Sequence, residues 1–311
     1  MLTASPRSAT TLSDAIWIDL LDPTDDERAR VERATKLRLP TKAAIEEIES
    51  SSRVFIEGGA FYLSTPVLES SDCMTGAVTA IGFVLSPAQL VTLRFRRVAA
   101  FDAVAASYSS VTAPSASDAF LKILENVVDY TADALEHASA ELERISHAAF
   151  HADGAPPAKA SQALRGALRQ LGRMGDGISH IRDALLGLGR IAAFVHEHGH
   201  ETHAAADAVR LKAIRADIAS LNDYQVHLSG KVQFLLDATL GFINIEQNDI
   251  VKTLTVVSVV GVPPVLIAGI YGMNFKNIPE FNWWFGYPYA LVLIVVSALL
   301  PIAWFKWRGW M

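Results

Sequence analysis

The tripeptide Gly272-Met273-Asn274 places a polar side chain at the end of a long apolar run, and it is the first candidate for a functional site. The amide of Asn274 offers N–H donors and a carbonyl acceptor without carrying a charge. Neutral dipoles of this kind can contact the water shell of a cation, whereas carboxylates bind too tightly or favour ions that lose water easily. Gly272 would allow the backbone to leave the preceding helix and turn.

A second group of potential ligands is the sequence HEHGHETH at residues 196–203. Imidazole side chains suit Ni²⁺, Co²⁺ and Zn²⁺, so this segment is a candidate metal site. A solvated turn between two long helices explains the same composition, and it is the interpretation that we favour. The histidines concerned are His196, His198, His200 and His203.

Two uncharged segments predict membrane-spanning helices at residues 253–271 and 287–305. Each would extend about 28 Å as a helix, close to the ~30 Å hydrocarbon core of a bilayer. The aromatic residues between them suit a membrane interface. The alternative is a pair of buried core helices. Both termini are expected in the cytoplasm, because the loop between the spans holds a single basic residue, Lys276, whereas others flank the pair at Lys252, Lys306 and Arg308.

Two helices cannot enclose a pore, so conduction would require several chains around a closed symmetry axis. Copies of Asn274 would then meet at the axis. Because Mg²⁺ dehydrates reluctantly and keeps several waters, a ring of neutral dipoles suits a hydrated Mg²⁺ ion. Neither span contains an acid, a histidine or a basic residue for a proton relay, which favours a channel over a proton-coupled exchanger.

The composition agrees with a large cytoplasmic part attached to a short membrane part. Hydrophobic residues make up 51% of the 311 residues, and most of the long apolar runs lie at the C-terminal end. The net charge of −6 argues against a general nucleic-acid-binding surface. The single Cys73 suits a reducing compartment. The first residues lack the apolar segment of a signal peptide, so we expect the bulk of the chain to stay in the cytoplasm.

The N-terminal part predicts a mixed α and β domain. Thr24 and Thr41 are candidate N-caps of two helices, the first of which would stop before Pro40. The glycine pair at 58–59 predicts a hairpin turn. No dinucleotide-binding motif, phosphate-binding loop or nucleophile motif is present, so we expect no enzymatic activity. Strands are predicted at 15–20, 53–57, 60–67, 78–85 and 89–95.

The pattern becomes helical from Ser117 onward, and this serine is itself a candidate N-cap. A seam of mostly apolar residues with coiled-coil-like spacing then leads into the first span without a turn signal. This predicts one helix over 203–271, about 100 Å long, that links the cytoplasmic part to the membrane. The alternative is a break near Gly230 or Gly241. The seam consists of Leu211, Ile214, Ile218, Leu221, Gln225, Leu228, Val232, Leu235, Thr239 and Phe242.

Several motifs resemble the CorA family of divalent-cation channels. The motifs are YGMNF, IPE, FGYP and WFKWRGWM near the C-terminus, the preceding INIEQNDIVKTLTVVSVVGVPPVLIAGIYGMNF, and WIDLLDPTDDE, LPT and EIESSSRVFIEGGAFYLSTPV nearer the N-terminus. The resemblance implies a homopentamer in the inner (plasma) membrane, with passive uptake of Mg²⁺ and also of Co²⁺ or Ni²⁺. Its partners would be divalent cations and the lipid bilayer, with no nucleic acid and no cofactor besides transported and regulatory Mg²⁺.

The fold class expected from the resemblance is an α+β cytoplasmic domain followed by long stalk helices and a C-terminal two-helix transmembrane hairpin. The expected segments are the α/β domain at 1–115, the helical stalk at 116–252, the pore-lining first span at 253–271, the extracytoplasmic loop at 272–286, the second span at 287–305 and a basic tail at 306–311.

The resemblance also implies roles for individual residues. Gly272, Met273 and Asn274 would form the outer selectivity filter. Leu254 would form a hydrophobic constriction, and Val251 stands where the family often has a larger apolar residue. The expected pore-facing series shares one helix face, because its members advance by three or four positions. The series is Asp237, Leu240, Asn244, Asn248, Val251, Leu254, Ser258, Val262 and Val265.

For two members of the pore-facing series, an interpretation without a role in conduction is also open. Asp237 matches an acidic ring that would concentrate cations, and the alternative is a solvated carboxylate on the stalk. Asn248 matches a polar ring in the pore, and the alternative is a hydrogen bond between helices. The pair Pro263-Pro264 should bend the pore helix or free backbone carbonyls toward the lumen.

The outer mouth departs from the family. Members commonly have an acid directly after GMN-Phe, where this chain has Lys276, whose charge Glu280 would offset in part. Family members also bind a regulatory Mg²⁺ between subunits, and Asp207 and Asp217 are the candidates here. Loss of this ion would loosen the stalk and open a pore that Leu254 and Val251 close by narrowing and dewetting.

Two other functions fit part of the pattern. A Zn²⁺ or Ni²⁺/Co²⁺ transporter like the ZntB branch would share the scaffold, but that branch usually replaces the methionine retained here as Met273. A membrane-anchored sensor or scaffold without conduction would not need the whole pore-facing series.

Overall fold

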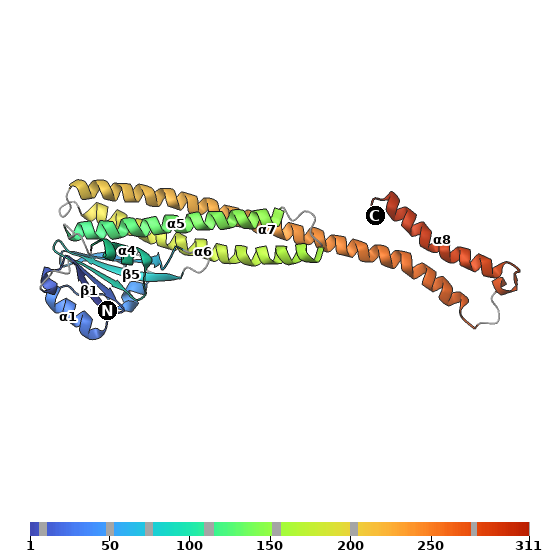
Figure 1. Ribbon diagram of the computed structural model, residues 1–311, viewed down its shortest axis with the longest axis horizontal. Helices are drawn as coiled ribbons and strands as arrows, with labels where there is room; N and C mark the ends of the chain where they lie inside the picture. Colours follow the sequence, from blue (N-terminus) through green and yellow to red (C-terminus); the bar gives the residue numbers. More distant parts are fainter. Residues whose placement is uncertain are drawn as a thin grey trace. The chain divides into compact units, whose positions relative to one another are not determined.

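A six-stranded sheet lies in the N-terminal part of the computed structural model, in the order β1-β2-β6-β5-β4-β3 (Figure 1). Strand β2 pairs with β6 in parallel, and the other neighbours are antiparallel. The structure describes residues 1–5, 11–47, 53–71, 77–108, 115–150, 157–199, 205–274 and 279–310. The strands are β1 (Leu2–Ser5), β2 (Trp17–Leu21), β3 (Val54–Glu57), β4 (Ala60–Leu68), β5 (Val78–Leu85) and β6 (Leu90–Arg94).

Strands β2 to β6 confirm the predicted strand segments to within a residue or two at each end. The predicted hairpin turn between β3 and β4 is also confirmed, because Gly58 and Gly59 have φ angles of 59° and 78°, which favour glycine. Strand β1 was not predicted. It is four residues long, and its place in the sheet comes from antiparallel pairing with β2.

Two short helices begin at the predicted threonines. Helix α1 (Asp25–Thr35) starts with a capping box, in which the Glu27 N–H donates to Thr24 Oγ1 and the Thr24 N–H donates to Glu27 Oε2. Helix α2 (Lys42–Glu46) starts where the Ala44 N–H donates to Thr41 Oγ1. Each threonine satisfies a backbone donor that the first helical turn leaves unpaired.

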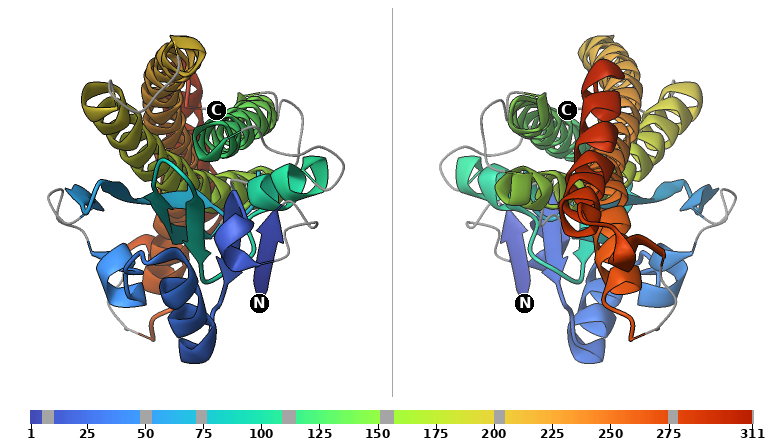
Figure 2. Two further views of the ribbon diagram at one scale, coloured as in Figure 1. Left: turned by 90° about the vertical axis from the view of Figure 1, so that its left-hand side faces the viewer. Right: turned by 90° about the vertical axis from the view of Figure 1, so that its right-hand side faces the viewer.

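The two faces of the sheet support separate hydrophobic clusters. One cluster joins Ile18, Val84 and Leu93 of the sheet to Val31 of α1 and Ile45 of α2. The other joins the opposite face to α4 (Ala99–Ser107) and to the long helices α5 (Ala116–Phe150), α6 (Pro157–His198) and α7 (Ala205–Tyr271). Figure 2 shows α1 and the long helices on opposite sides of the sheet. Added to the sheet, the helices confirm an α+β domain.

The remaining elements are long helices. They are α5 (Ala116–Phe150), α6 (Pro157–His198), α7 (Ala205–Tyr271) and α8 (Gly286–Trp307), with the short 3₁₀ helix η2 (Pro279–Asn282) before α8. The predicted cap at Ser117 was wrong, because α5 already begins at Ala116 and the Asp118 N–H donates to Ser115 Oγ. Ser115 is the residue that stands three positions before this amide, which is the spacing of an N-cap.

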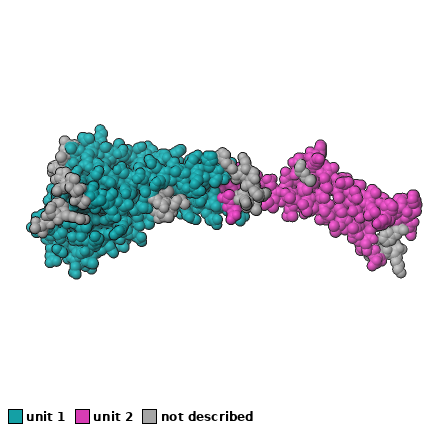
Figure 3. Space-filling view, viewed as in Figure 1, with its two compact units in different colours: residues 1–156, 165–237 teal, residues 157–164, 238–311 magenta. Residues whose placement is uncertain are grey.

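Helix α7 is one helix of 67 residues, so the alternative of a break near Gly230 or Gly241 was wrong. The predicted seam is also confirmed, since most of its members, including Gln225 and Thr239, are buried. The chain divides into two compact units (Figure 3), namely Met1–Pro156 with Arg165–Asp237, and Pro157–Leu164 with Ala238–Met311. Helix α7 therefore contributes to both units.

Candidate functional site

Helices α7 and α8 are long and apolar enough to cross a membrane, by length and composition. Their apolar segments contain the two spans predicted from the sequence. The apolar windows of these helices are almost entirely unburied, and Val265 of α7 and Leu300 of α8 are 73% and 65% exposed. Apolar faces of this extent need lipid or another chain to cover them, which separates these helices from the core helices of a soluble protein.

The predicted pore-facing series occupies one side of α7, and every member is exposed in the single chain. Leu254 is 65% exposed and Val251 is 59% exposed. On the other side of this helix, Val256, Val260 and Ile267 are partly covered, and at 3.6 residues per turn they point away from Leu254 and its series. The series is thus free for contact with other chains or with ions.

The two polar members that had alternatives differ in their surroundings. Asp237 accepts hydrogen bonds from Gln233 Nε2 at 3.1 and 3.3 Å, one turn earlier on the same helix. Asn248 is exposed, and among the described residues its side chain has no hydrogen-bond partner. The N–H donors and the carbonyl acceptor of the Asn248 amide therefore remain available to water, to an ion or to a neighbouring helix.

The tripeptide follows directly after the last residue of α7. The Gly272 N–H donates to Ala268 O at 2.9 Å, the Met273 N–H donates to Ile270 O at 3.2 Å, and Asn274 is exposed. Gly272 does turn the chain, but its φ lies outside the left-handed range. A Cβ at this position would lie 3.1 Å from Ala268 O, so a close carbonyl contact explains the preference for glycine here.

Residues 279–286 fold into a tight turn that leads into α8. The Trp283 N–H donates to Glu280 O, and the Gly286 N–H donates to Trp283 O. A Cβ on Gly286 would overlap the backbone carbonyl of Glu280, so this turn requires glycine. Glu280 is partly buried. Lys276 lies outside the described residues, and its expected effect on cations remains a prediction.

At the other end of α8 the chain turns back through Gly309, whose φ is 70°. The Trp310 ring stacks on Phe305 at 5.5 Å and lies 5.9 Å from Lys252 Nζ of α7, while the Arg308 guanidinium lies over Trp304. Basic and indole groups thus gather at one end of the apolar segments, as they do at membrane interfaces.

The proline pair lies inside α7, which stays helical through Pro263 and Pro264. Neither proline has an N–H, so the carbonyls of Val259 and Val260 lose the donor four residues ahead. The predicted freeing of backbone carbonyls follows from this chemistry, and their orientation toward a lumen remains a prediction.

The candidate regulatory residues are not brought together in a single chain. No group of three or more potential metal ligands forms among the described residues. Asp207 is partly buried and Asp217 is exposed on α7. The His198 ring lies 4.4 Å from the Phe194 ring at a tilt of 32°, and its Nδ1 lies 3.0 Å from Phe194 O. His196 is partly buried, whereas His200 and His203 lie outside the described residues.

A polar cluster that the sequence analysis missed holds the start of α7 against α5. The Arg210 guanidinium donates to Asp118 Oδ1 at 2.7 Å and to both Glu125 oxygens at 2.9 Å. The Tyr108 hydroxyl donates to Asp118 Oδ2 at 2.8 Å. Hydrogen bonds to Glu125 and Asp118 raise the pKa of Arg210, while burial and Asp118 raise the pKa of Tyr108. No local motif marks these residues, because the partners are far apart in the chain.

Comparisons with known proteins agree with one another. The family model described as CorA-like Mg²⁺ transporter protein matches residues 13–307. The magnesium transport protein CorA of Haemophilus ducreyi is 32% identical over 313 residues, which cover 100% of this chain and 96% of that protein. The protein of the same name from Escherichia coli K12 is 34% identical over 303 residues, which cover 96% and 93%.

Two solved structures share the fold at low sequence identity. The complete structure of the CorA magnesium transporter from Methanocaldococcus jannaschii has a TM-score of 0.76 at 19% identity, and the match covers 95% of this chain and 91% of that chain. The full-length CmaX protein has a TM-score of 0.68 at 15% identity, with coverage of 94% and 88%. These likenesses confirm the predicted order of α+β domain, long helices and C-terminal apolar helices.

Proposed function

The chain belongs to the family of CorA-like Mg²⁺ transporters, which are not enzymes, and we propose that it is a passive channel for Mg²⁺ uptake driven by the membrane potential. The observation that carries the proposal is the position of Gly272-Met273-Asn274 at the end of α7, directly after an exposed face that carries the pore-facing series. An inside-negative potential of 100 mV favours entry of a divalent cation by about 4.6 kcal/mol.

The pore is built by several chains around one axis, with α7 of each chain facing the lumen. The exposed series on α7 supports this arrangement, because a single chain leaves it uncovered. The family resemblance favours five chains. The basic residues Lys252, Lys306 and Arg308 favour a cytoplasmic location for both termini in the inner membrane, under the positive-inside rule.

Asn274 forms the outer filter and contacts the water shell of Mg²⁺ through neutral dipoles, with Gly272 and Met273 shaping the turn that presents it. Reluctant dehydration distinguishes Mg²⁺ from ions that shed water easily. Co²⁺ and Ni²⁺ pass through the same filter. Farther along the lumen, Val251 and Leu254 form the gate, and Asp237 concentrates cations at the cytoplasmic end.

Cytoplasmic Mg²⁺ regulates the gate by binding between subunits and holding the closed state. The continuity of α7 supports the coupling, since one rigid element carries both the regulatory candidates Asp207 and Asp217 and the gate. The clamp of Arg210 on α5 fixes the start of the same helix.

The test is ion flux into liposomes that contain the purified protein, a trapped Mg²⁺-sensitive dye and a potassium diffusion potential. Asn274→Ala should abolish Mg²⁺ entry, whereas Asn282→Ala, an exposed asparagine of the same mouth outside the tripeptide, should retain it. Undiminished entry through Asn274→Ala would refute the filter assignment. Entry of Zn²⁺ without Mg²⁺ would favour the ZntB-like function, and no flux of any cation would favour a sensor or scaffold.

A further inference from the structure

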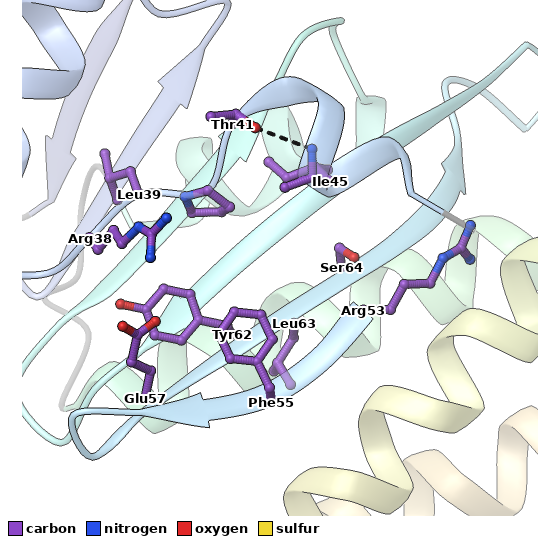
Figure 4. Close-up of a pocket in the computed structure, with 12 residues that line it drawn as sticks. Arg38, Leu39, Thr41, Ile45, Arg53, Phe55, Glu57, Tyr62, Leu63 and Ser64 are labelled. Atoms are coloured by element: carbon purple, nitrogen blue, oxygen red, sulfur yellow. Dashed lines mark hydrogen bonds between the residues drawn. The ribbon is translucent and has the colours of Figure 1, made fainter. Parts of the chain in front are cut away.

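A cavity of about 180 Å³ lies between α2 and the strands β3 and β4, far along the sequence from the proposed pore (Figure 4). The volume is below the roughly 300 Å³ at which pockets for drug-sized ligands begin. The cavity therefore suits a small organic molecule.

Two apolar surfaces enclose the cavity. On one side the rings of Phe55 and Tyr62 stack in parallel, with centroids 4.8 Å apart and planes at 2°. On the other side lies Ile45 of α2, and Pro40, two residues before α2, also lines the cavity. A slot between an aromatic pair and aliphatic side chains favours a flat apolar body.

One end of the cavity carries an unused polar group. Ser64 is 7% exposed, lines the cavity, and its Oγ has no hydrogen-bond partner among the described residues. A buried hydroxyl without a partner is unfavourable, so this position is suited to a hydrogen bond with a ligand. Figure 4 shows Ser64 and Arg53 at this same end.

The charge at this end is positive. Arg53 Nε donates to Glu47 O at 2.7 Å, which orients the guanidinium. Burial and the nearby Arg190 lower the pKa of Arg53, and Asp183 offsets this only in part. At the opposite end, Arg38 and Glu57 bring opposite charges. An anionic group is therefore favoured at Arg53, and a single negative charge suits the cavity better than two because Glu57 lines the far end.

We propose that this cavity binds a small monocarboxylic acid with a flat apolar body. The carboxylate accepts hydrogen bonds from the guanidinium of Arg53 and the hydroxyl of Ser64, and the body lies between the Phe55–Tyr62 pair and Ile45. Arginine is the side chain best matched to a carboxylate in a partly desolvated position.

The experiment uses the full-length protein in nanodiscs of zwitterionic lipid and the probe 4-fluorobenzoate, observed by fluorine NMR. Two comparison ligands are 4-fluorobenzyl alcohol, which has a similar body without the charge, and inorganic phosphate, which has charge without the body. We expect saturable binding of the benzoate at millimolar concentrations, with weak binding of the alcohol and no competition by phosphate.

Three variants test the residues. Arg53→Gln should weaken benzoate binding at least about tenfold, as loss of a charge-assisted hydrogen bond predicts. Ser64→Ala should weaken it about fivefold without lowering the unfolding temperature of the ligand-free protein, because its hydroxyl has no partner to lose. The matched control is Arg30→Gln, which removes the same charge from the exposed surface of α1 and should leave binding unchanged.

A fourth variant keeps the test decisive if Arg53→Gln unfolds the domain. Ala44→Leu fills the cavity without touching a charge, and it should abolish binding. Absence of saturable benzoate binding, equal binding by the Arg53→Gln and Arg30→Gln proteins, equal affinity for the alcohol, or displacement by phosphate would each overturn the proposal.

Discussion

Replacing Arg210 by methionine should loosen the start of α7 while leaving the apolar stem of the side chain in place. Arg210 makes three charge-assisted hydrogen bonds, one to Asp118 and two to Glu125. The three side chains are 30%, 23% and 28% exposed, so the cluster is neither a surface pair nor a fully buried one. Removing the arginine leaves the partly buried carboxylates of Asp118 and Glu125 without their shared cation.

The loss of local stability expected from Arg210→Met lies between two limits. Exposed ion pairs contribute about 0.2–1 kcal/mol, and breaking a buried pair by removing one partner destabilises by about 3–5 kcal/mol. With roughly a quarter of each side chain in water, we expect about 2 kcal/mol of local destabilisation. That free energy corresponds to about a 30-fold increase in the population of the locally open state.

Amide hydrogen exchange on the full-length protein measures this opening directly. Amides of α7 around residues 207–214 should exchange about 30-fold faster in Arg210→Met than in the unmodified protein. The control is Arg144→Met, which removes a 60% exposed arginine paired within α5 and should change exchange less than about threefold. Equal exchange in the two variants would refute the inference that the Arg210 cluster holds α7 against α5.

Three further predictions follow from other residues. Burial and Asp118 raise the pKa of Tyr108 above its usual value near 10, so the unfolded state releases this proton first as pH rises. The free energy of unfolding should therefore fall as pH rises above about 10. Thermal scans at several pH values should show that Tyr108→Phe removes this part of the fall. Gly286→Ala should lower the unfolding temperature, because its Cβ would overlap the Glu280 carbonyl, whereas Gly230→Ala, with open space around it, should be neutral or stabilising by up to about 1 kcal/mol. Asp237→Asn should reduce Mg²⁺ flux more at low ionic strength than at high, since salt screens field focusing; an equal reduction at both would contradict the acidic ring.

Features that depend on near neighbours could be predicted from the sequence. Thr24 and Thr41 cap helices because a cap needs only a side-chain oxygen three residues before an unpaired amide. The seam on α7 was predicted because the burial of one helix face imposes a period of three to four residues. The two apolar spans follow from the same local logic, since a bilayer requires a long uncharged run. The prediction of Ser117 as the cap failed because Ser115 offers the same hydroxyl two positions earlier.

Features that depend on distant partners were decided by the tertiary structure. The Arg210 cluster joins Tyr108, the residue after α4, to α5 and α7, and Arg210 lies 85 and 92 residues from its two carboxylate partners. The cavity beside Ser64 exists because α2 packs against β4, and the Ser64 hydroxyl is left without a hydrogen-bond partner among the described residues. A Cβ on Gly272 would approach the carbonyl of Ala268 to 3.1 Å, and the φ of Gly272 is not left-handed.

The sequence by itself therefore determined the family, the membrane-length helices and the tripeptide at the end of α7, because motif identity and helical period are properties of contiguous residues. Only the tertiary structure decided which charges hold α7 against α5, which face of α7 stays uncovered and where a buried polar group lacks a partner. The burial of a side chain and the pairing of charges depend on chain segments that are far apart in the sequence and come together on folding. A local sequence pattern does not determine which distant segments pack together.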